Sequence, residues 1–492
     1  MLARSVGHAL YLSLGVVLAV AAYGTTVSLA AGTAATSPPA AAPPSPAAFE
    51  TALLKAANDL FARANLDNAR QKVVLVIDPL IDGITGAQSN ATQLMEKRIV
   101  DLVRTSYPRF EVGLFSWDAV SKSPVVLIGT FTAINNAGLA DGPRDAYRIC
   151  LALADLQTRR IISKGVARAL PEGINVTPTA FYADSPVFAR DASTDAYIKS
   201  CQGTRPGDAI DQTYSDRILV GSLITDGINA YNAKRYKDAL ELYKSALRLP
   251  GGEQLRVLNG IYLSYDALHR RNEAVEAFAR VIDYGLRAEK LAIKFLFQPG
   301  SMQFVRDQRV SAPYDGWLEK IAERAVAKKA CLEIVGHTSA TGLPMINDRL
   351  SLLRAEYVEE RLEAAAPDLH ARLIAAGRGS REMIVGTGRD DASDAVDRRV
   401  EFKVLRCLPD NAPGPEAEPR PDVEQKQPQV VAQQVTSALP MSQEDICKRD
   451  TARLARLRIS QGRDEVILFE HELGCENLRP QVLRLRESID PQ

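Results

Sequence analysis

Residues 334–358 of the chain read IVGHTSATGLPMINDRLSLLRAEYV, and this stretch predicts a strand, a loop and a long helix in that order. The strand ends at Gly336, and a loop rich in Thr, Ser, Ala and Gly follows. Apolar residues then recur at helical spacing, at Leu350, Leu353, Tyr357 and Val358. Such an element can place a polar loop residue and a basic helix residue, here Ser339 and Arg354, where one ligand could touch both.

The sequence on both sides of this stretch continues the alternation of strands and helices. Strand-like runs are LAIKFLF (291–297), CLEIVGH (331–337), RLIAAGRG (372–379) and DRRVEFKVLRC (397–407), and helix-like runs are YDGWLEKIAERAVAKKA (314–330) and MINDRLSLLRAEYVEERLEAAAP (345–367). This order of elements predicts an α/β domain over residues 287–407.

Four short motifs in this domain resemble those of OmpA-like peptidoglycan-associating domains in their order and spacing. They are GHTSATG (336–342), NDRLSLLRAEYV (347–358), AAGRG (375–379) and DRRVEF (397–402). The resemblance covers essentially all of residues 287–407 and implies a sandwich of βαβαββ type. It also implies a ligand: the peptide stem of peptidoglycan, bound at the free end of a meso-diaminopimelate residue.

The resemblance implies two charged partners for this zwitterionic ligand, and the chain has only one of them. Arg354, which opens the motif R-A-x-x-V, would supply two parallel N–H donors to the carboxylate. The family has an Asp after G-H-T to accept from the ammonium group, and here that position is Ser339. A hydrogen bond to a charged group contributes about 1.5–3 kcal/mol and a neutral one about 0.5–1.5 kcal/mol, so the exchange weakens ammonium binding.

Three interpretations of this departure remain open. The domain binds the wall in an altered or weakened way, or another carboxylate such as Asp348 replaces the missing one. In the third, the domain is a scaffold that no longer binds the wall.

The other residues expected at the peptidoglycan site are Thr338, His337, Asn347 and Arg398. We expect His337 to hydrogen-bond locally and hold the loop, and Asn347 to cap or brace the long helix. One arginine of the run Asp397-Arg398-Arg399 is expected to brace the ligand loop. The five histidines are scattered and no C-x-x-C occurs, so the sequence indicates no metal site and no cofactor.

Strand-like and helix-like runs also alternate in residues 49–213, which predicts a first α/β domain there. Strands are predicted in QKVVLVIDPL (71–80), FEVGLF (110–115) and PVVLIGTFTAI (124–134), with a helix in NATQLMEKRIVDLVRTSY (90–107) that Asn90 could cap. A hairpin is expected to follow, turning at 155–159. This pattern resembles the CsgG/LpoB-like family, which implies a secretion or cell-wall accessory role.

Residues 215–286 contain a repeat with an offset of 35 residues. Ala239 aligns with Ala274 and Tyr243 with Phe278, which resembles two tetratricopeptide repeats. Because about three such units are normally needed for stability, neighbouring elements are expected to cap the pair. The repeats are either a docking groove for a partner protein's peptide or a helical spacer between domains.

The two ends of the chain differ from these domains in composition. Residues 1–30 carry Arg4 followed by an apolar run, which predicts a cleaved signal peptide or a retained membrane anchor. An Ala/Pro-rich spacer follows at 31–48, and a Pro/Gln/Glu-rich linker, expected to be disordered, occupies 408–443. Residues 444–492 predict two or three short amphipathic helices.

The six cysteines pair in order along the chain, each pair inside one of the predicted segments. The pairs are Cys150 with Cys201, Cys331 with Cys407, and Cys447 with Cys475. An even count and an export leader together predict three disulfides in an oxidising compartment.

The whole chain is predicted to be a multidomain α/β and α protein. Its 492 residues imply two to four domains, and its 60 basic and 60 acidic residues give no net field that would attract nucleic acid. No nucleophile–base pair or paired carboxylates stand out, so no catalytic residue and no enzyme is predicted. We expect a protein of a Gram-negative periplasm or envelope that binds peptidoglycan and presents modules to other envelope proteins. The alternative is an assembly factor or regulator of a secretion or cell-wall synthesis machine in which wall binding is weak or lost.

Overall fold

The computed structural model describes most of the chain between residues 45 and 407 and part of the tail. The described residues are 45–66, 72–140, 144–188, 190–298, 300–384, 386, 397–407, 447, 450, 451, 454, 457, 466, 469 and 473–489. The predictions of a leader at 1–30 and a linker at 408–443, and most of the spacer at 31–48, lie outside these residues. None of the helices formed by the described residues combines the length and apolar character that crossing a membrane requires.

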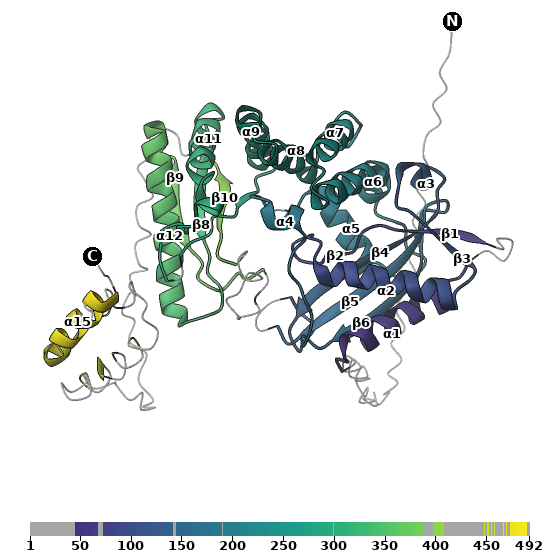
Figure 1. The fold of residues 1–492 in the computed structure, drawn as a ribbon, viewed down its shortest axis with the longest axis horizontal. Coiled ribbons are helices and arrows are strands. Elements are labelled where there is room, and N and C mark those ends of the chain that lie inside the picture. The colour runs from purple at the N-terminus through teal and green to yellow at the C-terminus, as the bar shows by residue number, and fades with distance from the viewer. Residues whose placement is uncertain are drawn as a thin grey trace, which may run out of the picture. The chain divides into compact units, whose positions relative to one another are not determined.

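The N-terminal α/β part is built on a six-stranded sheet (Figure 1). Its strands are β1 (Val73–Ile77), β2 (Ile81–Asp82), β3 (Phe110–Gly113), β4 (Val125–Ile134), β5 (Ala146–Asp155) and β6 (Arg160–Ala169). They lie in the order β3-β1-β4-β5-β6, with β2 beside β4. The pairs among β1 to β4 are parallel, whereas β4, β5 and β6 form an antiparallel meander. The three predicted strands and the hairpin that turns at 155–159 are confirmed.

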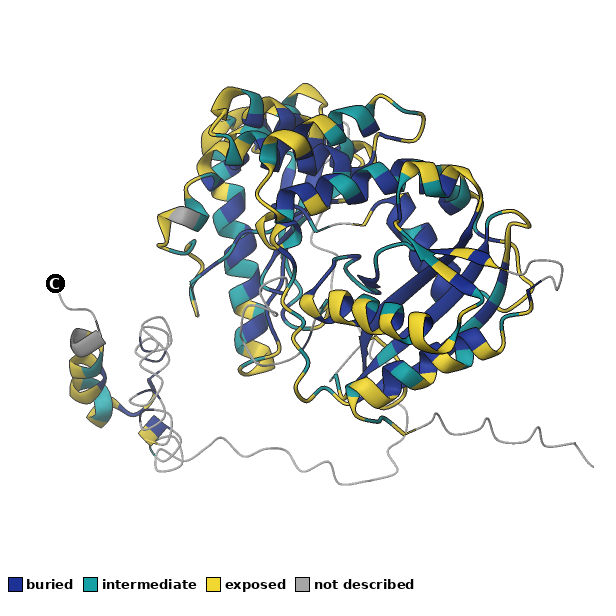
Figure 2. Cartoon of the chain, turned by 45° about the vertical axis from the view of Figure 1, so that its right-hand side comes forward, coloured by how far each residue is buried: buried dark blue, intermediate teal, exposed yellow. Residues whose placement is uncertain are grey.

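Helices cover both faces of this sheet because its strand residues alternate between two apolar cores. Leu75, Leu127 and Leu151 lie in a core with α1 (Phe49–Ala62) and α2 (Asn90–Ser106). The intervening strand residues pack on the other face against α3 (Trp117–Ser121), α5 (Ala192–Gln202) and the start of α6. Figure 2 shows the strands buried and the outer sides of the covering helices exposed. The cap of α2 is Ser89, which exchanges hydrogen bonds with Thr92, so the prediction of Asn90 as the cap was wrong by one residue.

Four helices in two hairpins follow the sheet. They are α6 (Gln212–Asn232), α7 (Tyr236–Leu247), α8 (Leu255–Ala267) and α9 (Arg271–Arg287). Tyr243 fills the space between them, because Gly227 and Gly260 leave room for its ring: a Cβ added there would lie 2.7 and 2.4 Å from that ring. The assignment of these hairpins to tetratricopeptide repeats stays a prediction.

Residues 287–407 contain a second sheet with the predicted element order. The elements are β7 (Leu291–Ile293), α10 (Gln308–Ser311), α11 (Tyr314–Ala327), β8 (Cys331–Gly336), α12 (Pro344–Ala365), the 3₁₀ turn η1 (Pro367–Leu369), β9 (Leu373–Gly377) and β10 (Val400–Leu405). The strand order is β7-β10-β8-β9, with only β8 and β9 parallel. The disulfide Cys331–Cys407 joins the start of β8 to the residues after β10 and is confirmed.

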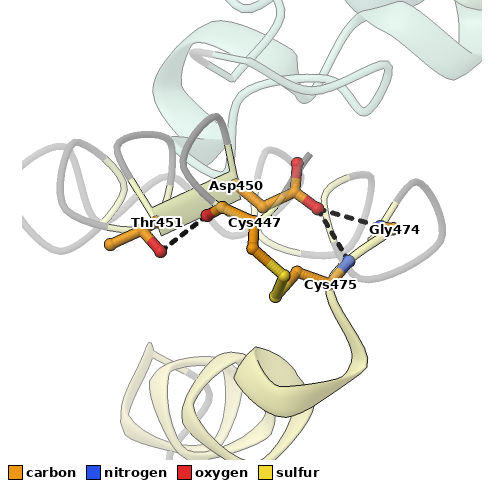
Figure 3. Close-up of a disulfide and its surroundings, with 5 residues drawn as sticks. All are labelled: Cys447, Asp450, Thr451, Gly474 and Cys475. Atoms are coloured by element: carbon orange, nitrogen blue, oxygen red, sulfur yellow. Dashed lines mark hydrogen bonds between the residues drawn. A yellow bond between two sulfur atoms is a disulfide. The ribbon is translucent and has the colours of Figure 1, made fainter. Parts of the chain in front are cut away.

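The tail has a small core of its own. Its described apolar residues are Leu454, Leu457, Val466, Phe469, Leu473 and Val482, and its regular elements are η3 (Glu476–Leu478) and α15 (Arg479–Ile489). The predicted disulfide Cys447–Cys475 is present, and Asp450 beside it accepts hydrogen bonds from the amides of Gly474 and Cys475 at 2.9 and 3.0 Å (Figure 3).

The third predicted disulfide is wrong, because Cys150 and Cys201 are both free, buried thiols. Cys150 lies on β5 and Cys201 on α5, and each Sγ donates to the other residue's backbone carbonyl, at 2.9 and 3.0 Å. The pairing along the sequence therefore identified neighbours, but their sulfur atoms satisfy backbone acceptors and are not bonded to each other.

Candidate functional site

The predicted ligand site lies where β8 ends and α12 begins. Gly336 ends the strand, and Pro344 starts the helix, where a residue without an amide proton is well tolerated. The helix crosses the strand ends at very close range, since a Cβ on Gly336 or Gly377 would fall 2.0 or 2.6 Å from atoms of Ser351. The two glycines of the sequence motifs thus bring α12 down onto the sheet and fix the turn 338–342 beside it.

Polar groups of the turn and of the first helical turns meet around Ser339. The Ser339 Oγ lies 3.0 Å from the Oγ1 of Thr341, and Asn347 donates from Nδ2 to the carbonyls of Thr341 and Ser339, at 2.9 and 3.4 Å. Ser339 and Asn347 are nearly buried, 4% and 5% exposed. Asn347 was expected to cap or brace the long helix; it lies inside α12, whose N-cap is Leu343, and braces the turn.

Arg354 is fully buried beneath a loop that the sequence did not point to. Its side chain is 1% exposed, Nε donates to the Ser301 carbonyl at 3.0 Å, and Nη2 donates to the Gln298 carbonyl at 3.3 Å. The guanidinium also lies over the Phe297 ring, 4.8 Å from its centroid. The guanidinium group that was expected to bind a ligand carboxylate thus binds the chain's own loop between β7 and α10.

Asp348, the carboxylate considered as a replacement for the family's aspartate, has a partner of its own. Its Oδ1 accepts from Nη1 of Arg381 at 2.5 Å, and the side chain is 45% exposed. On the same side of the helix, Ser351 accepts from the amide of Gly379 at 2.8 Å, and the Gly379 carbonyl accepts from the amide of Thr338 at 2.9 Å. The turn, the helix and the segment after β9 are therefore joined by two successive hydrogen bonds, one of them to the Ser351 side chain.

We expected His337 to hydrogen-bond locally and hold the loop, and its ring does not do so. Within the described part of the chain, neither ring nitrogen has a hydrogen-bond partner, and neither does the Thr338 hydroxyl. Burial, together with the nearby charges of Arg399, Lys403 and Arg378, lowers the pKa of His337 to about 2. The ring is neutral at any physiological pH, so it acts as a buried packing group whose backbone amide donates to the Arg399 carbonyl.

Of Arg398 and Arg399, only Arg399 is buried beside the site, where its carbonyl accepts from the amide of His337. Arg399 is 3% exposed, donates from Nε to Glu401 at 2.6 Å and lies over the Phe188 ring, 5.7 Å from the centroid. Arg398 is partly exposed. Asp397 is buried and accepts from the amides of Ile384 and Gly386, at 2.6 and 2.7 Å, so it secures the loop after β9.

The polar turn thus lies at the start of α12, and the buried guanidinium of Arg354 lies further along that helix, beneath the loop between β7 and α10. The turn offers neutral acceptors to an ammonium group, and the cation could bind a carboxylate once the carbonyls of Gln298 and Ser301 are displaced. Sequence reasoning missed this loop because carbonyl groups carry no residue-type signal; Phe297 was the one side chain that could have pointed to it.

Neither a metal site nor a large cavity stands out elsewhere among the described residues. They contain no group of three side chains suited to a metal ion. Two cavities, of about 40 and 20 Å³, lie between the first sheet and the helical hairpins, and Tyr182, Thr194 and Arg256 line both. Each has room for only a few water molecules.

Comparison with known proteins finds similarity in solved structures alone. No family model and no curated protein matches the chain. The peptidoglycan-associated lipoprotein of Burkholderia pseudomallei is 26% identical over 23% of this chain and 89% of its own, with a TM-score of 0.20. The cell wall anchor of the T6SS of Pseudomonas aeruginosa is 24% identical over 26% and 96%, with a TM-score of 0.21. The OmpA-like domain of FopA1 from Francisella tularensis is 15% identical over 24% and 75%, with a TM-score of 0.19.

Proposed function

We propose that this chain is a non-enzymatic protein of the bacterial cell envelope whose residues 287–407 associate non-covalently with peptidoglycan. The observation that carries the proposal is a polar turn held by Ser339, Thr341 and Asn347, with the buried cation Arg354 two turns further along the same helix. A diaminopimelate end needs a cation for its carboxylate and acceptors for its ammonium group. The four motifs that place these residues there are the ones through which the segment resembles OmpA-like domains.

The state of Arg354 makes this association conditional. A ligand carboxylate has to replace two neutral carbonyls, of Gln298 and Ser301, as the acceptors of the guanidinium. Charge-assisted, bidentate pairs are roughly twice as strong as neutral hydrogen bonds, so the exchange is favourable once the loop has opened. Opening the loop and the missing negative charge at Ser339 both oppose it, which predicts weak binding.

Sedimentation of the full chain with purified peptidoglycan sacculi tests the proposal. Arg354→Ala should lower the bound fraction, and Ser339→Asp should raise it, because a carboxylate restores the ammonium partner. Arg361→Ala is the matched control, since Arg361 lies two turns further along α12 and pairs with Asp315 on the protein surface. Recovery of the unmodified chain wholly in the supernatant at low salt, or no response to either site variant, would contradict wall binding at this turn.

The second candidate is an assembly factor or regulator of an envelope machine, in which the N-terminal domain and the hairpins contact other proteins and wall binding is weak or absent. The neutral Ser339 and the engagement of Arg354 by the chain's own loop favour it. Crosslinking in cells separates the two, because a regulator would be captured with a protein partner even when Arg354→Ala has removed any wall binding.

A further inference from the structure

The face of the hairpins formed by α6 and α8 is covered by the chain's own connecting segment, residues 179–188. This segment contains the short helix α4 (Ala180–Asp184), which contacts both α6 and α8 (Figure 1). Its anchor is Phe181, 1% exposed, whose ring lies 5.9 Å from that of Tyr231 and 6.0 Å from that of Tyr243. Tyr243 is the residue that packs between Gly227 and Gly260, so the anchor reaches the centre of the hairpin pair.

Polar side chains of the hairpins bind the segment along its length. On α6, the side-chain oxygen of Asn232 accepts from the amide of Phe181 at 2.9 Å, and the Tyr231 hydroxyl donates to Asp184 at 2.9 Å. On α8, Asn259 donates to the hydroxyl of Ser185 at 2.7 Å. An aromatic anchor in an apolar site with side-chain amides on the peptide groups is how a groove holds a bound peptide.

The polar part of the fit is incomplete, although Phe181 itself lies in the apolar core. Within the described part of the chain, the Asn232 Nδ2 and the Asn259 Oδ1 are buried without a hydrogen-bond partner. The larger cavity, about 40 Å³, lies beside this contact and is lined by Phe181, Ser185 and Asn259 among others. A buried polar atom left unsatisfied costs about 1–3 kcal/mol, so a peptide that also satisfied these two amides could displace the segment.

We propose that residues 179–188 are an intramolecular ligand of the hairpins, and that a partner's peptide of the same chemistry competes for the α6/α8 face. The partner's peptide carries an aromatic anchor, a carboxylate three residues later and a hydroxyl next to it, as in Phe181, Asp184 and Ser185. The segment lowers the affinity for such a peptide by acting as a tethered competitor, whose effective concentration is of the order of millimolar.

This inference concerns the partner-binding part of the proposed function and does not rest on wall association. A chain that does not sediment with sacculi can still bind the peptide. Failure of the wall-binding proposal is therefore distinguishable from failure of this inference.

The test uses a fluorescent peptide, PTAFYADSPVF, with the sequence of residues 178–188, titrated into the full chain. The unmodified protein should bind it at least about tenfold more weakly than Phe181→Ala, in which the anchor site is vacant. Adding Tyr231→Phe to that variant should weaken binding again, because the partner of the peptide's carboxylate is lost. A peptide with alanine at its first phenylalanine should not bind.

Phe110→Ala is the matched control, since Phe110 is a buried aromatic residue in β3 that packs on Phe61, away from the hairpins. Equal peptide binding by this control and by Phe181→Ala would overturn the proposal, as would equal binding by the unmodified protein. If Phe181→Ala does not fold, Asp184→Asn keeps the anchor and removes only the charge facing Tyr231. A folded Asp184→Asn that binds the peptide no better than the unmodified protein also contradicts the proposal.

Discussion

The indole nitrogen of Trp317 on α11 donates a hydrogen bond to the Tyr262 hydroxyl on α8, at 3.0 Å. The Trp317 ring also stacks on Phe278 of α9, with centroids 5.4 Å apart, and Arg324 of α11 pairs with Asp283 of α9. Helix α11 of the 287–407 domain therefore continues the stack of hairpins, and one apolar core spans the hairpins and this domain.

This relationship predicts that the hairpins and the 287–407 domain unfold together. Trp317→Ala should lower the free energy of unfolding of both by about 3–5 kcal/mol, the usual cost of removing a large buried aromatic side chain. Urea unfolding followed by hydrogen exchange checks it. Separate transitions for residues 212–287 and 291–405 in the unmodified protein would show that the merged core does not couple them.

Glycines in the hairpins should respond in opposite directions to the same substitution. Gly227→Ala places a methyl group 2.7 Å from the Tyr243 ring and should destabilise the protein by roughly 1–3 kcal/mol. Gly221→Ala lies in the same helix with no atom within 4 Å of the added Cβ, so helix propensity should stabilise it by up to about 1 kcal/mol. Thermal unfolding of the two variants measures this difference. Equal shifts of the melting temperature would contradict the close packing at Gly227.

Stability should fall as the pH rises from about 4 to 7. Burial raises the pKa of Asp78, whose Oδ2 accepts from Tyr214 at 2.8 Å, to about 7, and burial likewise raises that of Glu96 to about 7. Both carboxyls then bind a proton in the folded state that the unfolded chain, with a carboxyl pKa near 4, has already released in this pH range. The contribution of these two groups to the free energy of unfolding is therefore largest below pH 4. It decreases as the pH rises from about 4 to 7.

Urea unfolding at several pH values between 4.5 and 7.5 measures this slope. Asp78→Asn should flatten it, since the amide does not titrate. Asp59→Asn is the control: a hydrogen bond from Lys55 lowers the pKa of Asp59, so its contribution is lost only at more acid pH. A slope that Asp78→Asn leaves unchanged would show that Asp78 does not carry the effect.

The tail should need the disulfide Cys447–Cys475 to stay folded, whereas the second sheet should not need it. Closing a loop of 28 residues restricts the unfolded chain by about 3.5 kcal/mol, and the tail's described core offers only six fully buried apolar residues besides Cys475. Cys447→Ser with Cys475→Ser should abolish protection of the tail amides from hydrogen exchange and leave those of β8 and β10 unchanged. Retained protection in the tail would show that its core suffices alone.

Much of the architecture could be predicted because it is local. The alternation of apolar residues specifies β4 and β5, and the helical spacing together with Gly336 specifies the β8–α12 element. Two of the three cysteine pairs were found from their order along the chain. Helix α1 and the short helix α4 were not predicted, and neither was the merging of the cores around Trp317.

The sequence by itself determined the strand, turn and helix of residues 331–365, because Gly336, Pro344 and the helical spacing of apolar residues are local signals. It also determined that the turn carries no carboxylate, since residues 338–342 are Thr, Ser, Ala, Thr and Gly. Only the tertiary structure decided that Arg354 is held by the carbonyls of Gln298 and Ser301 and that Phe181 covers the hairpins. The hydrogen bonds that hold Arg354 and Phe181 join residues 53 and 51 positions apart, and a backbone group supplies one partner of each, so no periodicity or motif in the sequence records them.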